Sequence, residues 1–206
     1  MRLRLIIAIV MLLPVAAFAK GVLIMGDSIS AAYGIDEKQG WVALLRDHLS
    51  DQCSGIRVIN ASVSGETTAG GRQRLPALLN QYQPELVVIE LGGNDGLRGL
   101  SPMAMADNLR AMVEASRQAG AVPVLLGMKI PPNYGQQYTR LFEQQFRDLG
   151  NSLQVPLMPF FLEGVVSQGQ LQQDGIHPTA AAQPRLLANA LTVMDKPLAP
   201  LCRGGQ

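Results

Sequence analysis

Residues 21–30 read GVLIMGDSIS, an apolar run that ends abruptly in small and polar residues. A short apolar run without in/out alternation is typical of a strand that helices cover on both faces of a sheet. Asp27, Ser28 and Ser30 then lie where this buried strand should end. Ligands of open α/β sheets bind beyond the carboxyl ends of the strands. The stretch therefore raises the question of whether Ser28 is structural or reactive.

The rest of the chain repeats this pattern, because apolar runs alternate with segments whose apolar residues recur at helical spacing. We expect strands at 21–26, 56–61, 85–92, 121–128 and 155–160, and helices at 37–52, 68–82, 103–120, 136–150 and 178–195. Thr67 or Thr68 would cap the second helix, and Gly120 and Gly150 would end the third and fourth. The alternation predicts an α/β domain, a three-layer α/β/α sandwich around a five-stranded, mostly parallel sheet. Its expected strand order is the flavodoxin-like 2-1-3-4-5.

The first nineteen residues have the three parts of a secretory signal. Arg2 and Arg4 form a basic start, residues 5–15 are apolar, and residues 17–19 (AFA) are small at both ends. The apolar run of 11 residues is short for a bilayer span, which needs about 20. We expect a signal peptide at 1–19 and one domain at 20–206, periplasmic or secreted, without a stable membrane anchor. An uncleaved membrane anchor is the alternative.

Composition excludes several classes of function. The formal net charge of +1 gives no electrostatic footprint for nucleic acid. Two cysteines and two histidines without metal-ligand spacing predict no metal site. In an oxidising compartment, a lone cysteine pair is a candidate disulfide. Cys53 follows the first helix and Cys202 the last, and the expected strand order makes the ends of these helices neighbours. We therefore predict a Cys53–Cys202 disulfide.

A reactive serine needs a base to remove its proton, and histidine is the usual one. His48 lies among leucines in the first helix, which is typical of a helix-surface residue. His177 follows the last strand in the segment DGIHP, three residues after Asp174. One turn can present both side chains, and a carboxylate there would orient the imidazole. Alternatively, Asp174 only shapes a turn and Pro178 starts a helix.

Acyl transfer also needs hydrogen-bond donors for the developing oxyanion. The loops after the second and third strands offer the backbone N–H of Gly65 and the side-chain amide of Asn94. The backbone N–H of Ser28 would be a third donor. Each has a simpler interpretation, since glycine serves turns with positive φ and asparagine forms local Asx turns.

Four ordered blocks carry a resemblance that covers essentially the whole chain after residue 19. They are GDSIS (26–30), NASVSGETT (60–68), LGGNDGLRG (91–99) and DGIHP (174–178). In this order and spacing they resemble the SGNH (GDSL-type) hydrolase family. The resemblance implies Ser28 as nucleophile, His177 as base, Asp174 as its orienting acid, and Ser28, Gly65 and Asn94 as the oxyanion hole. Glu66 stands where the second block usually has aspartate.

The resemblance implies a serine hydrolase that cleaves carboxylic esters and thioesters through an acyl-serine, without metal or cofactor. Fatty acyl esters, acyl-CoA-type thioesters and lysophospholipids are the expected small-molecule substrates. Apolar residues beyond strands three to five could line an acyl groove: Met128, Ile130, Pro131, Phe160 and Phe161. Plain packing is the alternative for each. We expect a monomer. Two other functions remain open, a carbohydrate O-deacetylase of the same fold and a non-catalytic lipid carrier.

Overall fold

The computed structural model describes residues 21–53 and 55–203, so the expected signal peptide lies outside the described residues. Five strands form one sheet: β1 (Gly21–Gly26), β2 (Arg57–Asn60), β3 (Leu86–Glu90), β4 (Val122–Leu126) and β5 (Leu157–Met158). Every pairing is parallel, and the strand order is β2-β1-β3-β4-β5. This confirms the predicted flavodoxin-like order. Because the strands are parallel, the loops that follow them all lie at one edge of the sheet.

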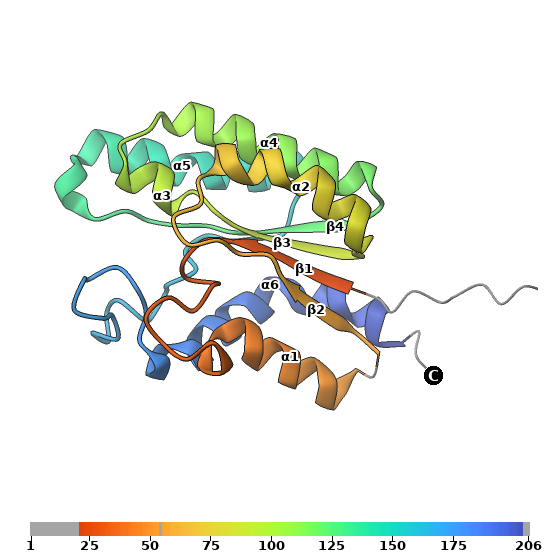
Figure 1. The fold of residues 1–206 in the computed structure, drawn as a ribbon. Helices are drawn as coiled ribbons and strands as arrows, with labels where there is room; N and C mark the ends of the chain where they lie inside the picture. Colours follow the sequence, from red (N-terminus) through yellow and green to blue (C-terminus); the bar gives the residue numbers. More distant parts are fainter. Residues whose placement is uncertain (1–20, 54, 204–206) are drawn as a thin grey trace, which may run out of the picture.

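Helices cover both faces of the sheet (Figure 1). The α-helices are α1 (Trp41–Gln52), α2 (Thr68–Tyr82), α3 (Gly93–Leu97), α4 (Pro102–Gln118), α5 (Gln136–Leu153) and α6 (Gln183–Arg203), and short 3-10 turns lie at Glu37–Gln39, Pro132–Tyr134 and Ala180–Ala182. Helices α1 and α6 lie on one face, and α2, α4 and α5 lie on the other. The central strands β1 and β3 are buried along their whole length, which explains their unbroken apolar sequences.

Several elements differ from the sequence-based expectations. Strand β5 has only two residues instead of 155–160, and α1 starts at Trp41 instead of residue 37. Helix α5 passes Gly150 and ends at Leu153, where Gln154 adopts the left-handed conformation. Gly150 instead allows close packing, since a Cβ there would lie 2.9 Å from the Leu157 side chain. Helix α6 starts at Gln183 instead of residue 178 and continues through Pro197 and Pro200. The short helix α3 was not expected.

Cys53 and Cys202 form a disulfide across 149 residues. It joins the end of α1 to the last turn of α6, the two helices that share one face of the sheet. Across residues 21–53 and 55–203, we find no helix with the length and apolar character that a membrane crossing requires.

Candidate active site

Ser28 lies in the turn that directly follows β1. The carboxylate of Asp27 shapes this turn, because its Oδ1 accepts a hydrogen bond of 3.0 Å from the Ile29 N–H. The Ser28 carbonyl accepts from the Tyr33 N–H at 3.0 Å, which closes the turn. Ser28 is half-buried and lines a mainly apolar cavity. The local sequence therefore presents the Ser28 hydroxyl at the sheet edge.

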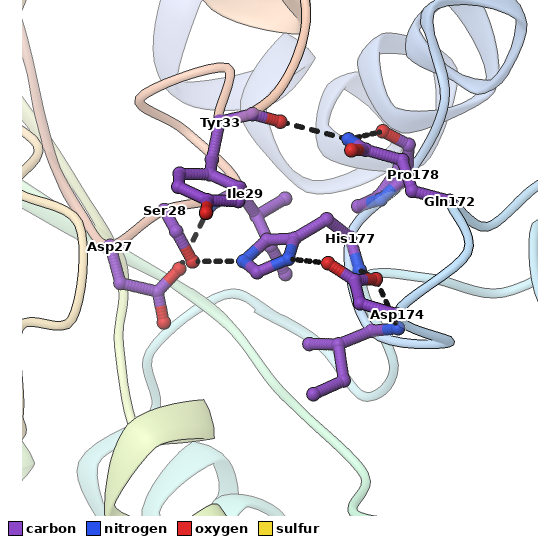
Figure 2. Close-up of polar contacts among 9 residues, drawn as sticks. Asp27, Ser28, Ile29, Tyr33, Gln172, Asp174, His177 and Pro178 are labelled. Atoms are coloured by element: carbon purple, nitrogen blue, oxygen red, sulfur yellow. Dashed lines mark hydrogen bonds and ion pairs between the residues drawn. The ribbon is translucent and has the colours of Figure 1, made fainter.

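The imidazole of His177 points toward the hydroxyl of Ser28 (Figure 2). Its Nε2 lies 2.8 Å from Ser28 Oγ, and its Nδ1 lies 2.6 Å from Asp174 Oδ2. The other oxygen of Asp174 accepts from the backbone N–H groups of Ile176 and His177 at 2.9 and 3.0 Å. These hydrogen bonds lower the pKa of Asp174 to about 2. The bond from the His177 side chain has the largest effect, and the two backbone bonds come next. The carboxylate is therefore ionised at neutral pH and can only accept, so His177 Nδ1 carries the proton.

The second histidine lies elsewhere. His48 borders a separate cleft beside the disulfide, between α1 and α6. This placement agrees with its interpretation as a helix-surface residue.

Asn94 lines the same cavity as Ser28 and His177. Its Nδ2 donates one hydrogen bond to Asp27 Oδ2 at 3.0 Å. An amide nitrogen has two hydrogens, so a second one remains for a ligand in the cavity. Asp27 thus bonds both the turn of Ser28 and the side chain of Asn94. Its burial raises its pKa to about 6.

Gly65 has a positive φ of 80°, which favours glycine. Its carbonyl accepts from Nη2 of Arg98 at 3.0 Å, and Arg98 directly follows α3, the helix that contains Asn94. Gly65 is not among the residues that line the cavity around Ser28. The neighbouring Glu66 pairs with Arg74 Nε at 2.8 Å. Arg74 also donates to the Ala61 carbonyl, so the longer acid is accommodated by a side chain from α2.

The cavity has a volume of about 570 Å³ and a mainly apolar lining. Four of the five predicted groove residues line it: Met128, Ile130, Pro131 and Phe160. Phe161 does not, which corrects that expectation. Its side chain is 0% exposed and packs edge-on against Trp41, with ring centroids 5.3 Å apart. The chain turns at this point, because the Phe160 carbonyl accepts from the Glu163 N–H at 3.1 Å, and only Phe160 reaches the cavity.

Sequence reasoning missed a buried acid behind the nucleophile. Glu90 ends β3 with 0% exposure, and its Oε2 accepts from Ser30 Oγ at 2.6 Å. Trp41 Nε1 donates to the same hydroxyl at 3.1 Å. Burial, followed by the charge of Asp27, raises the pKa of Glu90 well above its ordinary value. A glutamate inside the apolar run VVIELG was the signal that could have identified it.

Within the described residues, no three His, Cys, Asp or Glu side chains are grouped so that they could hold a metal ion. The Ser28–His177–Asp174 hydrogen bonds offer the chemistry of a base-activated serine nucleophile.

A doubly wound α/β domain with hydrogen-bonded serine, histidine and aspartate side chains beyond its parallel strands has the architecture of a serine hydrolase. The sequence profile of the GDSL-like lipase/acylhydrolase family matches residues 24–184, and the chain belongs to this family. It is 52% identical to esterase TesA of Pseudomonas aeruginosa over 193 residues, 93% of this chain and 95% of that protein. It is 45% identical to thioesterase 1/protease 1/lysophospholipase L1 of Escherichia coli K12, over 82% of this chain and 80% of that protein.

Solved structures agree with these sequence relatives. The crystal structure of TesA superposes with a TM-score of 0.81 at 52% identity, covering 88% of this chain and 99% of that one. The psychrotrophic esterase EstA of Pseudoalteromonas sp., inhibited by monoethylphosphonate, also gives a TM-score of 0.81, at 42% identity. That comparison covers 87% of this chain and 99% of EstA.

Proposed function

We propose that the protein hydrolyses carboxylic esters and thioesters through an acyl-serine intermediate on Ser28. The observation that carries this proposal is a pair of hydrogen bonds beside an apolar cavity that Ser28 and His177 line. Ser28 Oγ lies 2.8 Å from His177 Nε2, and His177 Nδ1 lies 2.6 Å from Asp174 Oδ2. Several relatives are named esterase, arylesterase or thioesterase, in keeping with this chemistry.

We assign each group a role in the proposed reaction. His177 Nε2 takes the proton of Ser28 as Oγ attacks the acyl carbonyl, and Asp174 stabilises the imidazolium that forms. The backbone N–H of Ser28, the backbone N–H of Gly65 and the second amide hydrogen of Asn94 bind the oxyanion. His177 returns its proton to the leaving alcohol or thiol. A water molecule then repeats the cycle on the acyl-serine and releases the acid.

Fatty acyl groups are the proposed acyl class, in simple esters, acyl-CoA-type thioesters and lysophospholipids. A cavity of about 570 Å³ with a mainly apolar lining offers a long acyl chain a favourable environment. An acetyl group would fill only a small part of it, which argues against a carbohydrate O-deacetylase. The complete Ser–His–Asp chain argues against a non-catalytic lipid carrier.

We further propose that residues 1–19 are a signal peptide, that residues 20–206 form one periplasmic or secreted domain, and that this domain acts as a monomer. The basic start and short apolar run of residues 1–19 support export. The disulfide between Cys53 and Cys202 fits an oxidising compartment.

The test is hydrolysis by the purified mature protein of p-nitrophenyl esters and acyl thioesters from acetyl to palmitoyl. We expect kcat/KM to rise with chain length until the cavity is filled. Ser28→Ala should lower kcat by more than roughly 10³-fold, with an unchanged circular dichroism spectrum.

Turnover by Ser28→Ala equal to that of the wild type would refute serine catalysis. A folded wild type that cleaves only acetyl esters of sugars would instead support the deacetylase. A folded wild type that binds fatty acids without any turnover would support the carrier.

A further inference from the structure

Gln172 forms a bridge between the two loops that hold the candidate nucleophile and base. Its Nε2 donates to the Tyr33 carbonyl at 2.8 Å and to the Pro178 carbonyl at 3.0 Å (Figure 2). Tyr33 ends the turn that contains Ser28, and Pro178 directly follows His177. Both amide hydrogens of Gln172 are therefore used, one on each loop.

On the base side, Gln172 lies at the foot of a hairpin that contains Asp174 and His177. Its backbone N–H donates to the His177 carbonyl at 2.7 Å, and its carbonyl accepts from Gly175 at 3.0 Å. The adjacent residues Leu171 and Pro178 form an antiparallel bridge. The hairpin is largely exposed, so its position relative to Ser28 depends on the contacts at its foot and on those between the two loops.

On the nucleophile side, Tyr33 makes two contacts with the base loop. Besides accepting from Gln172, it packs its ring against the imidazole of His177, with ring centroids 4.5 Å apart. The preceding residue, Ala32, has a φ of 58°, a left-handed conformation that is unfavourable for alanine. Such strain persists only where surrounding contacts stabilise it, and it is concentrated at functional sites.

Gly34 leaves the space that this bridge needs. Its φ is +77°, and a Cβ there would lie 2.3 Å from Gln172 Oε1. The Gln172 amide thus packs directly on the backbone of the nucleophile loop.

We propose that Gln172 is a positioning residue, which holds the His177 hairpin against the Ser28 turn and so fixes the distance between His177 Nε2 and Ser28 Oγ. This inference rests on the proposed function of the Ser–His–Asp chain. A displacement of about 1 Å at reacting groups can lower a rate by about 10²-fold. The acyl chain binds in the apolar cavity, to which Gln172 does not contribute. The loss of Gln172 should therefore lower kcat and leave KM nearly unchanged.

The experiment compares Gln172→Glu, Gln172→Met and the control Gln173→Ala, which alters the exposed neighbour on the same hairpin. Glutamate keeps the shape of Gln172 but turns a carboxylate toward two carbonyl oxygens, and methionine keeps the bulk without any donor. Hydrolysis of p-nitrophenyl butyrate is measured, with the concentration of reactive Ser28 titrated by a fluorophosphonate and folding followed by thermal melting. We expect kcat per reactive site to fall about 10- to 100-fold in both Gln172 variants, KM to change less than twofold, and Gln173→Ala to match the wild type.

Three results would overturn the proposal. The first is a kcat per titrated site within twofold of the wild type in both Gln172 variants. The second is an equal loss in Gln173→Ala, because the effect would then belong to the hairpin in general. The third is a rise in KM with constant kcat, because Gln172 would then act on substrate binding. Failure of the proposed function is recognised separately, because Ser28→Ala would then retain the activity of the wild type.

Discussion

Asp27 occupies a central position in the site although it is not part of the Ser–His–Asp chain. One carboxylate oxygen bonds the Ile29 N–H and the other bonds Asn94 Nδ2, each at 3.0 Å. It therefore connects the nucleophile turn, which follows β1, with the side chain proposed as an oxyanion donor in α3. Burial raises the pKa of Asp27 to about 6, and these two hydrogen bonds partly offset that rise.

Asp27→Asn tests this connection. An amide at residue 27 must direct its NH₂ group at either the Ile29 N–H or the Asn94 NH₂, and neither can accept. We expect Asn94 to turn its carbonyl oxygen toward residue 27 and to lose its orientation as a donor. The loss of one oxyanion donor lowers kcat by about 10²-fold, which steady-state kinetics would measure.

The matched comparison is a double-mutant cycle with Asn94→Ala. If Asp27 acts through Asn94, the double variant should be no slower than Asn94→Ala alone. Losses that multiply in the double variant would show that Asp27 acts independently of Asn94.

At the scale of elements, α2 and α3 are joined by a buried side-chain contact. Asp95 in α3 accepts from the backbone N–H of Thr68 at 2.8 Å and from its hydroxyl at 2.6 Å. Asn108 in α4 donates to the same hydroxyl at 3.1 Å. Gly65 lies shortly before Thr68 and Asn94 directly before Asp95, so this contact holds the two segments that contain the proposed donors against each other.

Thr68→Val should therefore destabilise the domain. Valine keeps the shape of threonine but leaves Asp95 Oδ1 and Asn108 Nδ2 without their shared partner in a buried region. We expect a loss of about 1–3 kcal/mol in the free energy of unfolding, measured by urea denaturation. Thr192→Val is the control, because that hydroxyl bonds the carbonyl of Asn189 in its own helix. It should change stability by no more than about 0.5 kcal/mol. Equal stabilities of the two variants would contradict the assigned role of Thr68.

Across the whole molecule, the disulfide and the candidate site lie at opposite edges of the sheet. Helix α1 starts at Trp41, whose indole bonds Ser30 near the site, and runs back along the sheet to Cys53. The bond between Cys53 and Cys202 therefore constrains the fold far from Ser28.

Replacing both cysteines by alanine should lower stability and leave catalysis unchanged. The bond closes a loop of 149 residues, for which the chain-entropy estimate gives an upper value of about 5 kcal/mol. Denaturation with and without dithiothreitol measures the difference, and the double variant should not respond to the reductant. Two titratable thiols per chain in the unfolded, unreduced wild type would show that the bond does not form.

The sequence by itself determined the architecture and the candidate nucleophile, base and acid. Unbroken apolar runs and helical spacing are local patterns, so the five strands could be predicted from them. The strand order was correctly predicted from the doubly wound α/β class that their alternation indicates. Asp174 and His177 are three residues apart, so a single turn brings them together.

Only the tertiary structure decided how the site is supported, because those contacts join residues that are far apart in the chain. Glu90 meets Ser30 across 60 residues, Asp27 meets Asn94 across 67, and Gln172 meets Tyr33 across 139. No local pattern encodes such pairings. The same reason explains the misplacement of Phe161, since hydrophobicity alone does not tell a cavity wall from the core. The folded structure buries Phe161 in the core and leaves Phe160 at the cavity. Burial on folding also raises the pKa values of Asp27 and Glu90.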